Sequence, residues 1–379
     1  MAWSLVLTDL NYNPVGEILN AKERTINLGL SRVETCSFKV RMDNQLMPDL
    51  EGCEGYVKAY RDGALQFFGP IVKTEEVADS NTQSLAVNCA SPAWFLSKRM
   101  YGTWMPSGLP VNFAPNDRAL LASVVINDIN SQKGNTGIDW NTGNVSAGGL
   151  TPSPFYAIDY GTKALDVIQA LANTFDGFEW RMTPQEPAVV TGQAWTGYYI
   201  AKFNAVPHWG VTQENAIFEY GPERGNVQGY SRTRDRETQL NRAYHMKSGQ
   251  AQDAALTYTD ADSVAKWGVM EDFTPLDNVD NFPDLRSAWV KANVDARKNP
   301  REQIQFTPHI DPQRTGRLPN FSSDYDIGDT IRVRSTFRVD GEEITRFDRY
   351  MRLYSIQFQL DDTSGTERLT FTTIDDGTT

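Results

Sequence analysis

The feature that most constrains this chain is a series of short segments in which apolar and polar residues alternate, separated by turn residues. Residues 36–42 (CSFKVRM) place apolar side chains at every second position, as a strand with one buried face does. Residues 55–60 and 65–69 flank Arg61-Asp62-Gly63, and an Asp-Gly pair in that setting predicts a hairpin. Further strands are expected at 3–7, 71–77 and 84–90. Such a meander is typical of a small barrel or sandwich.

The middle of the chain has a different pattern. Residues 116–129 and 162–175 carry apolar side chains at helical spacing, and residues 178–182 resemble a strand. Between the helices, residues 133–150 are rich in Gly, Asn, Ser and Thr, which is a loop composition. These observations predict an α+β insertion.

The β pattern then returns. Strands are expected near 226–233 and 240–247, followed by a helix over 285–297 that stops before Pro300. The last strands are expected at 330–334, 350–360 and 368–373, with a turn at 361–365. The order is therefore β, α+β, β with a helix, and β. A chain of 379 residues is long enough for two to four domains.

The charge balance limits the partners. Asp and Glu number 48 against 36 Lys and Arg, a net charge of -12. An acidic surface does not hold nucleic acid, because phosphate binding needs a basic footprint, although an acidic protein could surround DNA without gripping it. No run of about 18 apolar residues predicts a membrane-spanning helix. The first ten residues lack a basic n-region, so we expect no signal peptide and synthesis in a cytoplasm.

No residue pattern predicts catalysis or a bound metal, so we expect no catalytic, cofactor-binding or metal-binding residue. The cysteines Cys36, Cys53 and Cys89 lack CxxC spacing and are interpreted as small residues of β structure. His208, His245 and His309 are far apart, each without a second ligand at metal-binding spacing. The dinucleotide-binding GxGxxG, the phosphate-binding GxxxxGK[ST] and the hydrolase GxSxG motifs are absent.

Three acidic groups are candidates for a catalytic or calcium-binding site. Asp260 with Asp262, and Asp277 with Asp280, could be paired carboxylates, but an acidic loop or a helix N-cap is the preferred interpretation. The run 324–329 (DYDIGD) is similar to the start of a calcium loop. Its fifth position would be Gly328 and its twelfth Ser335, neither of which supplies the expected carboxylate, so a turn before a strand is preferred.

The aromatic residues could in principle form glycan-binding platforms. Most of them lie inside strand or helix patterns, where packing in the core is expected. These residues are Phe38, Phe67, Phe178, Trp180 and Trp289. Tyr101, Trp104 and Met105 fit either role.

The order of several segments resembles the baseplate hub or tail-tip proteins of tailed phages. The resemblance covers nearly the whole chain, and its strength lies in the order and spacing of the segments. They are LQFFGPIV (65–72), NCAS (88–91), WFLSKR (94–99), ALDVIQAL (164–171), DSVAKWG (262–268) with Glu271, the helix end at Asn299-Pro300, IGDTIRV (327–333) and RYMRLYSI (349–356).

The resemblance implies a fold that is mainly β with α+β insertions: two β-barrel domains like those of tail-tube proteins, plus inserted α+β domains. The boundaries expected from it are 1–95 for the first tail-tube-like β domain and 96–205 for an inserted α+β domain. Residues 206–310 would form the second tail-tube-like domain with its helix, and residues 311–379 the strands that complete the hub.

The resemblance also implies a structural virion protein at the distal tip of a phage tail. It would form a homotrimer whose six tail-tube-like domains seat on a hexameric tail tube and let DNA pass without specific binding. Its partners would be the tail tube or distal tail protein, the tape measure protein and other baseplate or tail-fibre proteins. Because the chain ends just past the last expected strand, we expect no lytic extension. The channel wall is expected to be acidic or neutral, because basic side chains would retain DNA.

Two other functions remain open from the sequence. A secreted, β-rich glycan-binding module would be a monomer with exposed aromatic residues. A tail-associated lytic enzyme would need converging carboxylates or a metal. The size and shape of the assembled protein would separate the three.

Overall fold

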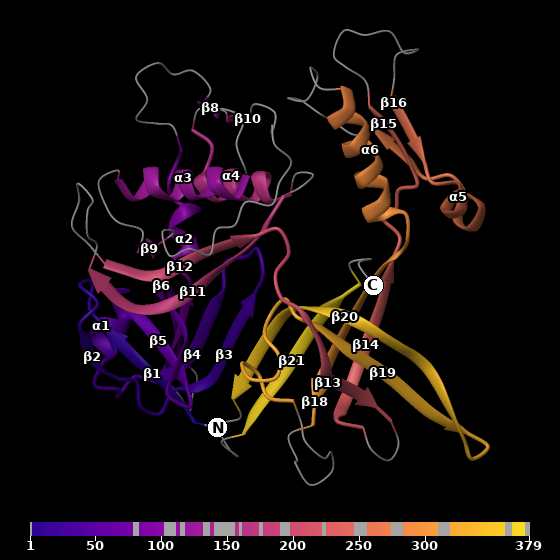
Figure 1. Ribbon diagram of the computed structural model, residues 1–379. Coiled ribbons are helices and arrows are strands. Elements are labelled where there is room, and N and C mark those ends of the chain that lie inside the picture. Colours follow the sequence, from indigo (N-terminus) through magenta and orange to yellow (C-terminus); the bar gives the residue numbers. More distant parts are fainter. Residues whose placement is uncertain are drawn as a thin grey trace.

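The computed structural model confirms a mainly β protein (Figure 1). It describes residues 2–78, 83–101, 111–113, 118–131, 137–139, 156–158, 161–173, 177–189, 198–221, 225–245, 256–273, 283–309, 319–360 and 366–375. The described residues form one 13-stranded sheet, three smaller sheets and the helices that cover them.

The strands of the large sheet come from the two ends of the chain. The first sheet half comprises β1 (Trp3–Thr8), β2 (Pro14–Glu17), β3 (Lys22–Gly29), β4 (Thr35–Arg41), β5 (Tyr56–Arg61), β6 (Ala64–Ala78) and β7 (Gln83–Ala90), with α1 (Met47–Glu51) between β4 and β5. The second sheet half comprises β13 (Thr212–Tyr220), β14 (Val227–Asp235), β18 (Arg301–Pro308), β19 (Thr330–Val339), β20 (Glu342–Leu360) and β21 (Glu367–Ile374).

The two sheet halves repeat the same strand order. Neighbours run β3-β4-β7-β6-β5-β1 in the first half and β14-β18-β21-β20-β19-β13 in the second, so strands correspond in chain order. A register shift interrupts β6–β7 pairing between Ile71 and Lys73, and the same irregularity interrupts β20–β21 between Leu353 and Ser355. One pair differs in direction, because β1 runs antiparallel to β5 whereas β13 runs parallel to β19.

The halves are joined by antiparallel pairing of β3 with β20, from Ser355 opposite Gly29 to Gln359 opposite Thr25. Their inward side chains form a common hydrophobic core, in which Ile26 faces Phe358 and both are almost fully buried. Burying a large apolar side chain stabilises the fold by about 1.5–3 kcal/mol. This shared core therefore makes the two halves one packed body.

The described strands do not close into barrels, so the expectation of two closed barrels is not confirmed. In the second half, β13 and β14 are sheet edges that do not pair with each other. One side chain bridges them near the turn: Asn226 donates from Nδ2 to the Ile217 carbonyl oxygen (2.8 Å) and accepts from the Glu219 N–H (2.7 Å). The amide thus supplies both bonds that a paired strand residue would supply there.

Two further units interrupt the sheet strands. The helical unit lies beside the first half and contains α2 (Ala93–Leu96), β8 (Val111–Phe113), α3 (Arg118–Ser131), β9 (Ile138–Asp139), β10 (Tyr156–Ile158), α4 (Ala164–Ala172), β11 (Glu179–Val189) and β12 (Tyr198–Val206). The small unit follows β14 and contains β15 (Arg242–His245), β16 (Leu256–Thr259), α5 (Ala261–Trp267), β17 (Glu271–Phe273) and α6 (Pro283–Arg297). Each has its own apolar cluster.

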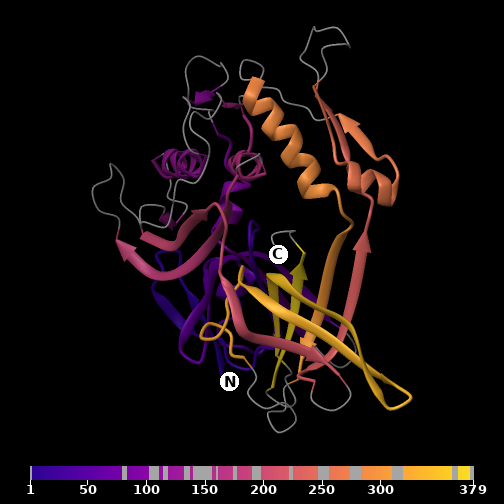
Figure 2. The same ribbon diagram turned by 45° about the vertical axis from the view of Figure 1, so that its right-hand side comes forward.

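Figure 2 shows both units on the same side of the sheet, with the small unit at the end of β14. The helices expected at 116–129, 162–175 and 285–297 correspond to α3, α4 and α6 with small shifts at their ends. In α4 the apolar stripe includes Leu165, Ile168 and Leu171, all buried against α3 and the β11–β12 sheet. Periodicity therefore located α4, which buries a single apolar face.

Candidate assembly interface

The helical unit is fixed to both sheet halves by an ionic junction, which we define as Glu34, Glu179, Arg181, Asp326 and Arg352; Glu34, Arg181 and Arg352 are buried, and Asp326 is half exposed. The guanidinium of Arg352 donates to both carboxylate oxygens of Glu179, and Arg181 donates to Glu34 and Asp326 at 3.3 Å each. Glu179 and Arg181 lie on β11 and Arg352 on β20. Because these strands belong to different units, the junction sets their relative positions.

Burial controls the charge of one junction residue. Glu34 is 1% exposed, and desolvation raises the pKa of its carboxyl to about 7 although Arg181 lies beside it and lowers it. The backbone N–H of Gly29 also donates to Glu34 (3.3 Å). The protonation of Glu34 therefore changes near neutral pH.

A second buried pair connects the start of the chain to its end. Arg61 on β5 donates two hydrogen bonds to Glu367 on β21 (2.8 and 2.9 Å), and the indole N–H of Trp3 donates to the same carboxylate (2.5 Å). The Arg61 guanidinium also lies over the ring of Phe358, 5.5 Å from its centre. This pair holds the two sheet halves together beyond the β3–β20 pairing.

The edge strand β14 presents an excess of positive charge. Arg232 and Arg234 both donate to the buried Glu302 on β18 (2.8–3.0 Å and 2.7 Å). Burial alone would raise the pKa of Glu302, but these hydrogen bonds outweigh it and lower that pKa. The Arg234 side chain stays 56% exposed, so this edge is available to a partner of opposite charge.

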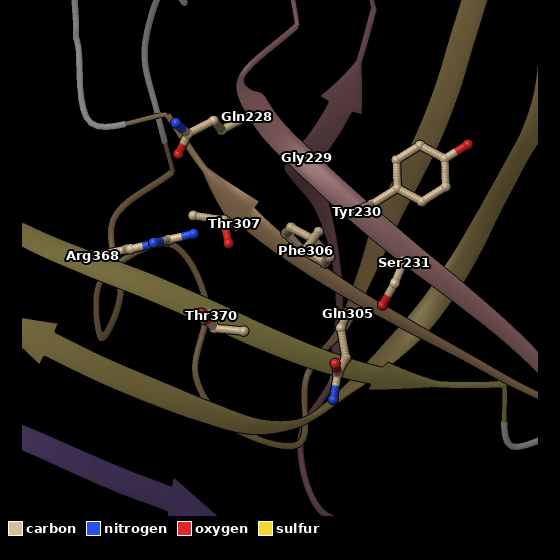
Figure 3. A pocket seen from close by; sticks show the side chains of 9 residues that line it. All are labelled: Gln228, Gly229, Tyr230, Ser231, Gln305, Phe306, Thr307, Arg368 and Thr370. Atoms are coloured by element: carbon tan, nitrogen blue, oxygen red, sulfur yellow. The ribbon is translucent and has the colours of Figure 1, made fainter.

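A polar hollow of about 460 Å³ lies on the sheet surface next to the same edge (Figure 3). Among its lining residues Arg368 and Tyr230 are ionisable, and none of those residues is an acid or a histidine. Its lining residues are Gln228, Gly229, Tyr230, Ser231, Gln305, Phe306, Thr307, Arg368 and Thr370.

A second exposed feature is the hairpin arm where β19 and β20 extend past the rest of the sheet (Figures 1 and 2). Phe337 pairs directly with Ile344 across the two strands, so both side chains lie on one face. They are 39% and 41% exposed, and Val339 beside them is 44% exposed. Asp340 and Gly341 at the tip both have positive φ, the backbone that a tight hairpin turn requires.

The three histidines lie far apart along the chain, and two of the three cysteines are buried. His208, His245 and His309 lie on separate segments, and the described part of the chain holds no group of three or more metal-binding side chains. Cys36 and Cys89 face each other across β4 and β7 as buried free thiols, and burial raises the pKa of Cys36 to about 12. Cys53 is half-buried.

The acidic groups mostly serve the backbone. Asp260 caps α5 by accepting from the Ser263 N–H (2.8 Å), which confirms the N-cap interpretation, and Asp262 lies in the first turn of the same helix. Asp277 and Asp280 lie outside the described residues.

The run 324–329 is a turn that leads into β19, as the sequence predicted. Asp324 accepts from the Asn320 N–H (2.9 Å), and Asp326 accepts from the Ile327 N–H (2.6 Å). Asp329 accepts from the N–H groups of Asp326 (2.9 Å) and Val211 (2.8 Å). These carboxylates therefore stabilise the backbone around the turn.

Of the aromatic residues singled out in the sequence, those with described side chains are buried. Phe38, Phe67, Phe178 and Trp180 are at most 5% exposed, and Tyr101 is buried with its hydroxyl donating to Asp128 (2.8 Å). Trp104, Met105 and the side chain of Trp289 lie outside the described residues. No helix in the described ranges has the length and apolar character needed to cross a membrane.

Known proteins resemble this chain in structure rather than in sequence. No protein-family model matches the chain, and no curated protein matches it by sequence. Among solved structures, a tail protein from Neisseria meningitidis superposes with a TM-score of 0.62 at 11% identity, covering 100% of this chain and 98% of the other. The 43 kDa tail protein of prophage MuSo2 from Shewanella oneidensis gives 0.62 at 12% identity, covering 99% and 100%.

A prophage tail protein from Listeria monocytogenes gives a TM-score of 0.54 at 11% identity, covering 99% of this chain and 95% of the other. The three matches cover at least 99% of this chain and at least 95% of each of the other proteins. From end to end, this chain therefore has the fold of phage and prophage tail proteins.

Proposed function

We propose that the chain is the baseplate hub at the distal end of a phage tail, a structural protein without enzymatic activity. The observation that carries the proposal is the repeated strand order of the two sheet halves within one chain. Two equivalent sheet halves per chain let three chains present six similar units, which matches a sixfold tube. The full-length likeness to tail proteins supports the same role.

In this proposal the domains follow the division expected from the sequence. Residues 1–95 form the first tail-tube-like domain and residues 96–205 the inserted α+β domain. Residues 206–310 and 311–379 form the second tail-tube-like domain with its inserted helix and closing strands. The homotrimer continues the tail tube and contacts the distal tail protein, the tape measure protein and the surrounding baseplate or fibre proteins. It resides in the virion at the tail tip.

DNA crosses the opening during ejection without specific binding. Three copies together carry three times the net charge of -12, and an acidic or neutral wall offers phosphates no binding sites. A structure of the assembled ring, with inward side chains counted by sign, tests this part. A wall lined mainly by Lys and Arg would contradict it.

Particle composition tests the role itself. Particles assembled in cells that express the full tail gene set should contain three copies of the chain, and gold-labelled antibody should mark only the tail end distal to the head. Labelling along the whole tail, or absence from purified particles, would refute the hub role. Hydrolysis of peptidoglycan by the purified chain would refute the non-enzymatic role.

A further inference from the structure

The free edge at the end of β6 is equivalent to an edge that is already occupied elsewhere in this chain. β20 pairs with β21 on one side over residues 355–359 and with β3 on the other. β6 pairs with β7 on one side over residues 73–78, but no described strand pairs with its other side there. β6 is equivalent to β20, and the neighbour of β20 on this side is β3. A strand that paired with β6 in the same way would be the equivalent of β3 in the other sheet half, and that strand is β14.

No described strand pairs with β14 on the side away from β18. Within one chain, β14 is the first strand of the path of paired strands, and β18, β21, β20, β3, β4 and β7 separate it from β6. We propose that β14 of one copy pairs antiparallel with residues 73–77 of β6 in a second copy, repeating the β3–β20 joint between chains. This inference deepens the hub function proposed above and rests on it for the number of copies in the ring.

The internal joint also fixes the register of the proposed one. The shared irregularity makes Lys73 equivalent to Ser355 and Glu76 equivalent to Phe358. The equivalence extends to β3 and β14 through the strands next to them. Cys36 on β4 opposes Cys89 on β7, and Ile304 on β18 opposes Thr373 on β21, so Cys36 is equivalent to Ile304. Ile26 on β3 pairs with Cys36 and Arg232 on β14 pairs with Ile304, so Ile26 and Arg232 are equivalent as well.

Transferring the β3–β20 register brings opposite charges together. Phe358 opposes Ile26 and Ser355 opposes Gly29 inside the chain. Between copies, the same pairs become Glu76 opposite Arg232 and Lys73 opposite Asp235. Directly opposed charges of opposite sign stabilise a strand pair, whereas any shift by one residue would separate them. Charge complementarity thus supports the register that symmetry predicts, although the register came from backbone pairing alone.

The exposure of both segments agrees with this partner. The Lys73 side chain is 64% exposed, Val77 is 44% exposed and Arg234 is 56% exposed. Charged residues on an edge strand prevent indiscriminate pairing but allow a complementary strand to add. Because the two edges differ, the contact is head-to-tail, and such contacts close into a ring when the rotation between copies permits.

Disulfide trapping tests the register. Glu75 would lie opposite Thr233, as Gln357 lies opposite Asn27 inside the chain. In a Cys53→Ser background, the full-length E75C/T233C variant should form intermolecular disulfides on oxidation. The resulting linked dimers and trimers should separate into monomers when a thiol reductant is added. The matched control is E75C/Q303C, since Gln303 faces Thr233 from the next strand inward and its thiol would be about 10 Å away.

Linkage in E75C/T233C but not in E75C/Q303C supports the pairing. Absence of linkage in both the purified chain and assembled particles, or equal linkage of the two variants, overturns it. The hub role is judged separately by labelling. Particles that carry the chain at the tail tip without this disulfide would refute only the interface, and a linked ring absent from particles would refute only the hub role.

Charge reversal provides a second measurement. K73D and D235K should each weaken association about tenfold in sedimentation velocity, and K73D/D235K should restore it to within about threefold. R41D makes the same charge change at a side chain that is 70% exposed on β4 and should leave association unchanged. Failure of the double variant to recover would contradict the proposed pair of Lys73 with Asp235.

Discussion

Arg352 closes a fork-to-fork ion pair with Glu179, and its remaining N–H groups donate to the carbonyl oxygens of Gly328 (3.1 Å) and Trp209 (2.8 Å). One side chain therefore connects β20, the start of β11 and the segment before β13. Trp209 returns a bond from its own N–H to Glu179 (2.7 Å). Arg352 is 5% exposed, so this network lies inside the molecule.

Arg352→Met should lower the free energy of unfolding by about 3–5 kcal/mol, because a partly buried carboxylate loses its counter-charge and two carbonyl oxygens lose this donor. Urea unfolding followed by fluorescence measures the change. Arg332→Met is the matched control: Arg332 pairs with Asp348 at the surface, where solvent screens the pair, so its loss should cost far less. Equal losses in both variants would contradict the special role of the ionic junction.

Glu34 should make stability depend on pH between about 4.5 and 7. Its pKa is raised from 4.5 to about 7 by burial, so over this range the unfolded chain releases a proton that the folded chain keeps. The stabilisation from protonated Glu34 is complete below pH 4.5 and is lost as pH rises through 7, by roughly 3 kcal/mol.

Glu34→Gln removes this titration. Urea unfolding at several pH values should show the variant gaining stability relative to the natural chain as pH rises from 5 to 8. Parallel pH profiles for the two proteins would show that Glu34 is charged in the folded state throughout, with Arg181 dominating over burial.

Asn226→Ala should destabilise the contact between the edge strands β13 and β14, which the Asn226 side chain bridges. The change leaves the Glu219 N–H and the Ile217 carbonyl oxygen without their partner, at a cost of about 1–3 kcal/mol. Hydrogen exchange should accelerate at Glu219 in particular. Asn44→Ala is the comparison, since Asn44 also both donates and accepts but at an exposed turn. A loss no larger at this contact than at that turn would argue against the bridging role.

Glu367→Gln should loosen the contact between the first and last strands. Arg61 then loses its counter-charge while 8% exposed, and the Trp3 indole loses part of its acceptor. The expected loss in unfolding free energy is about 3–5 kcal/mol. Glu23→Gln serves as the control, because Glu23 pairs with Lys39 at the surface, where the two side chains are 63% and 38% exposed. The prediction fails if both substitutions produce the same midpoint in urea.

Local signals in the sequence located α3, α4 and α6 and about half of the strands. The alternation at 36–42 became β4, and the Asp-Gly pair became a tight turn with positive φ at Asp62 and Gly63. The strands β3, β12, β13 and β18 were missed. In β3, Ile26 and Leu28 alternate correctly, but the first half of the strand is charged. The Asp340-Gly341 turn carried the same signal as Asp62-Gly63 and could have been found.

The junction residues carried no signal of their own. Glu34, Arg181 and Arg352 look like ordinary solvated charges in the sequence, because burial depends on which strands meet above them. The same holds for Arg61 and Glu367, which lie at opposite ends of the chain. Only the pairing of β3 with β20 and the position of β11 bring these charges together.

The sequence alone therefore determined where the longer helices, several turns and many of the strands occur, since φ/ψ preferences and hydrophobic periodicity act over a few residues. It also determined the acidic balance and the order of segments typical of tail proteins. The tertiary structure decided that two halves repeat one strand order, that the described strands of neither half close into a barrel, and that β14 and the end of β6 each have a described neighbour on one side only. Strand neighbours separated by hundreds of residues depend on the packing of the whole core, so no local pattern could specify them.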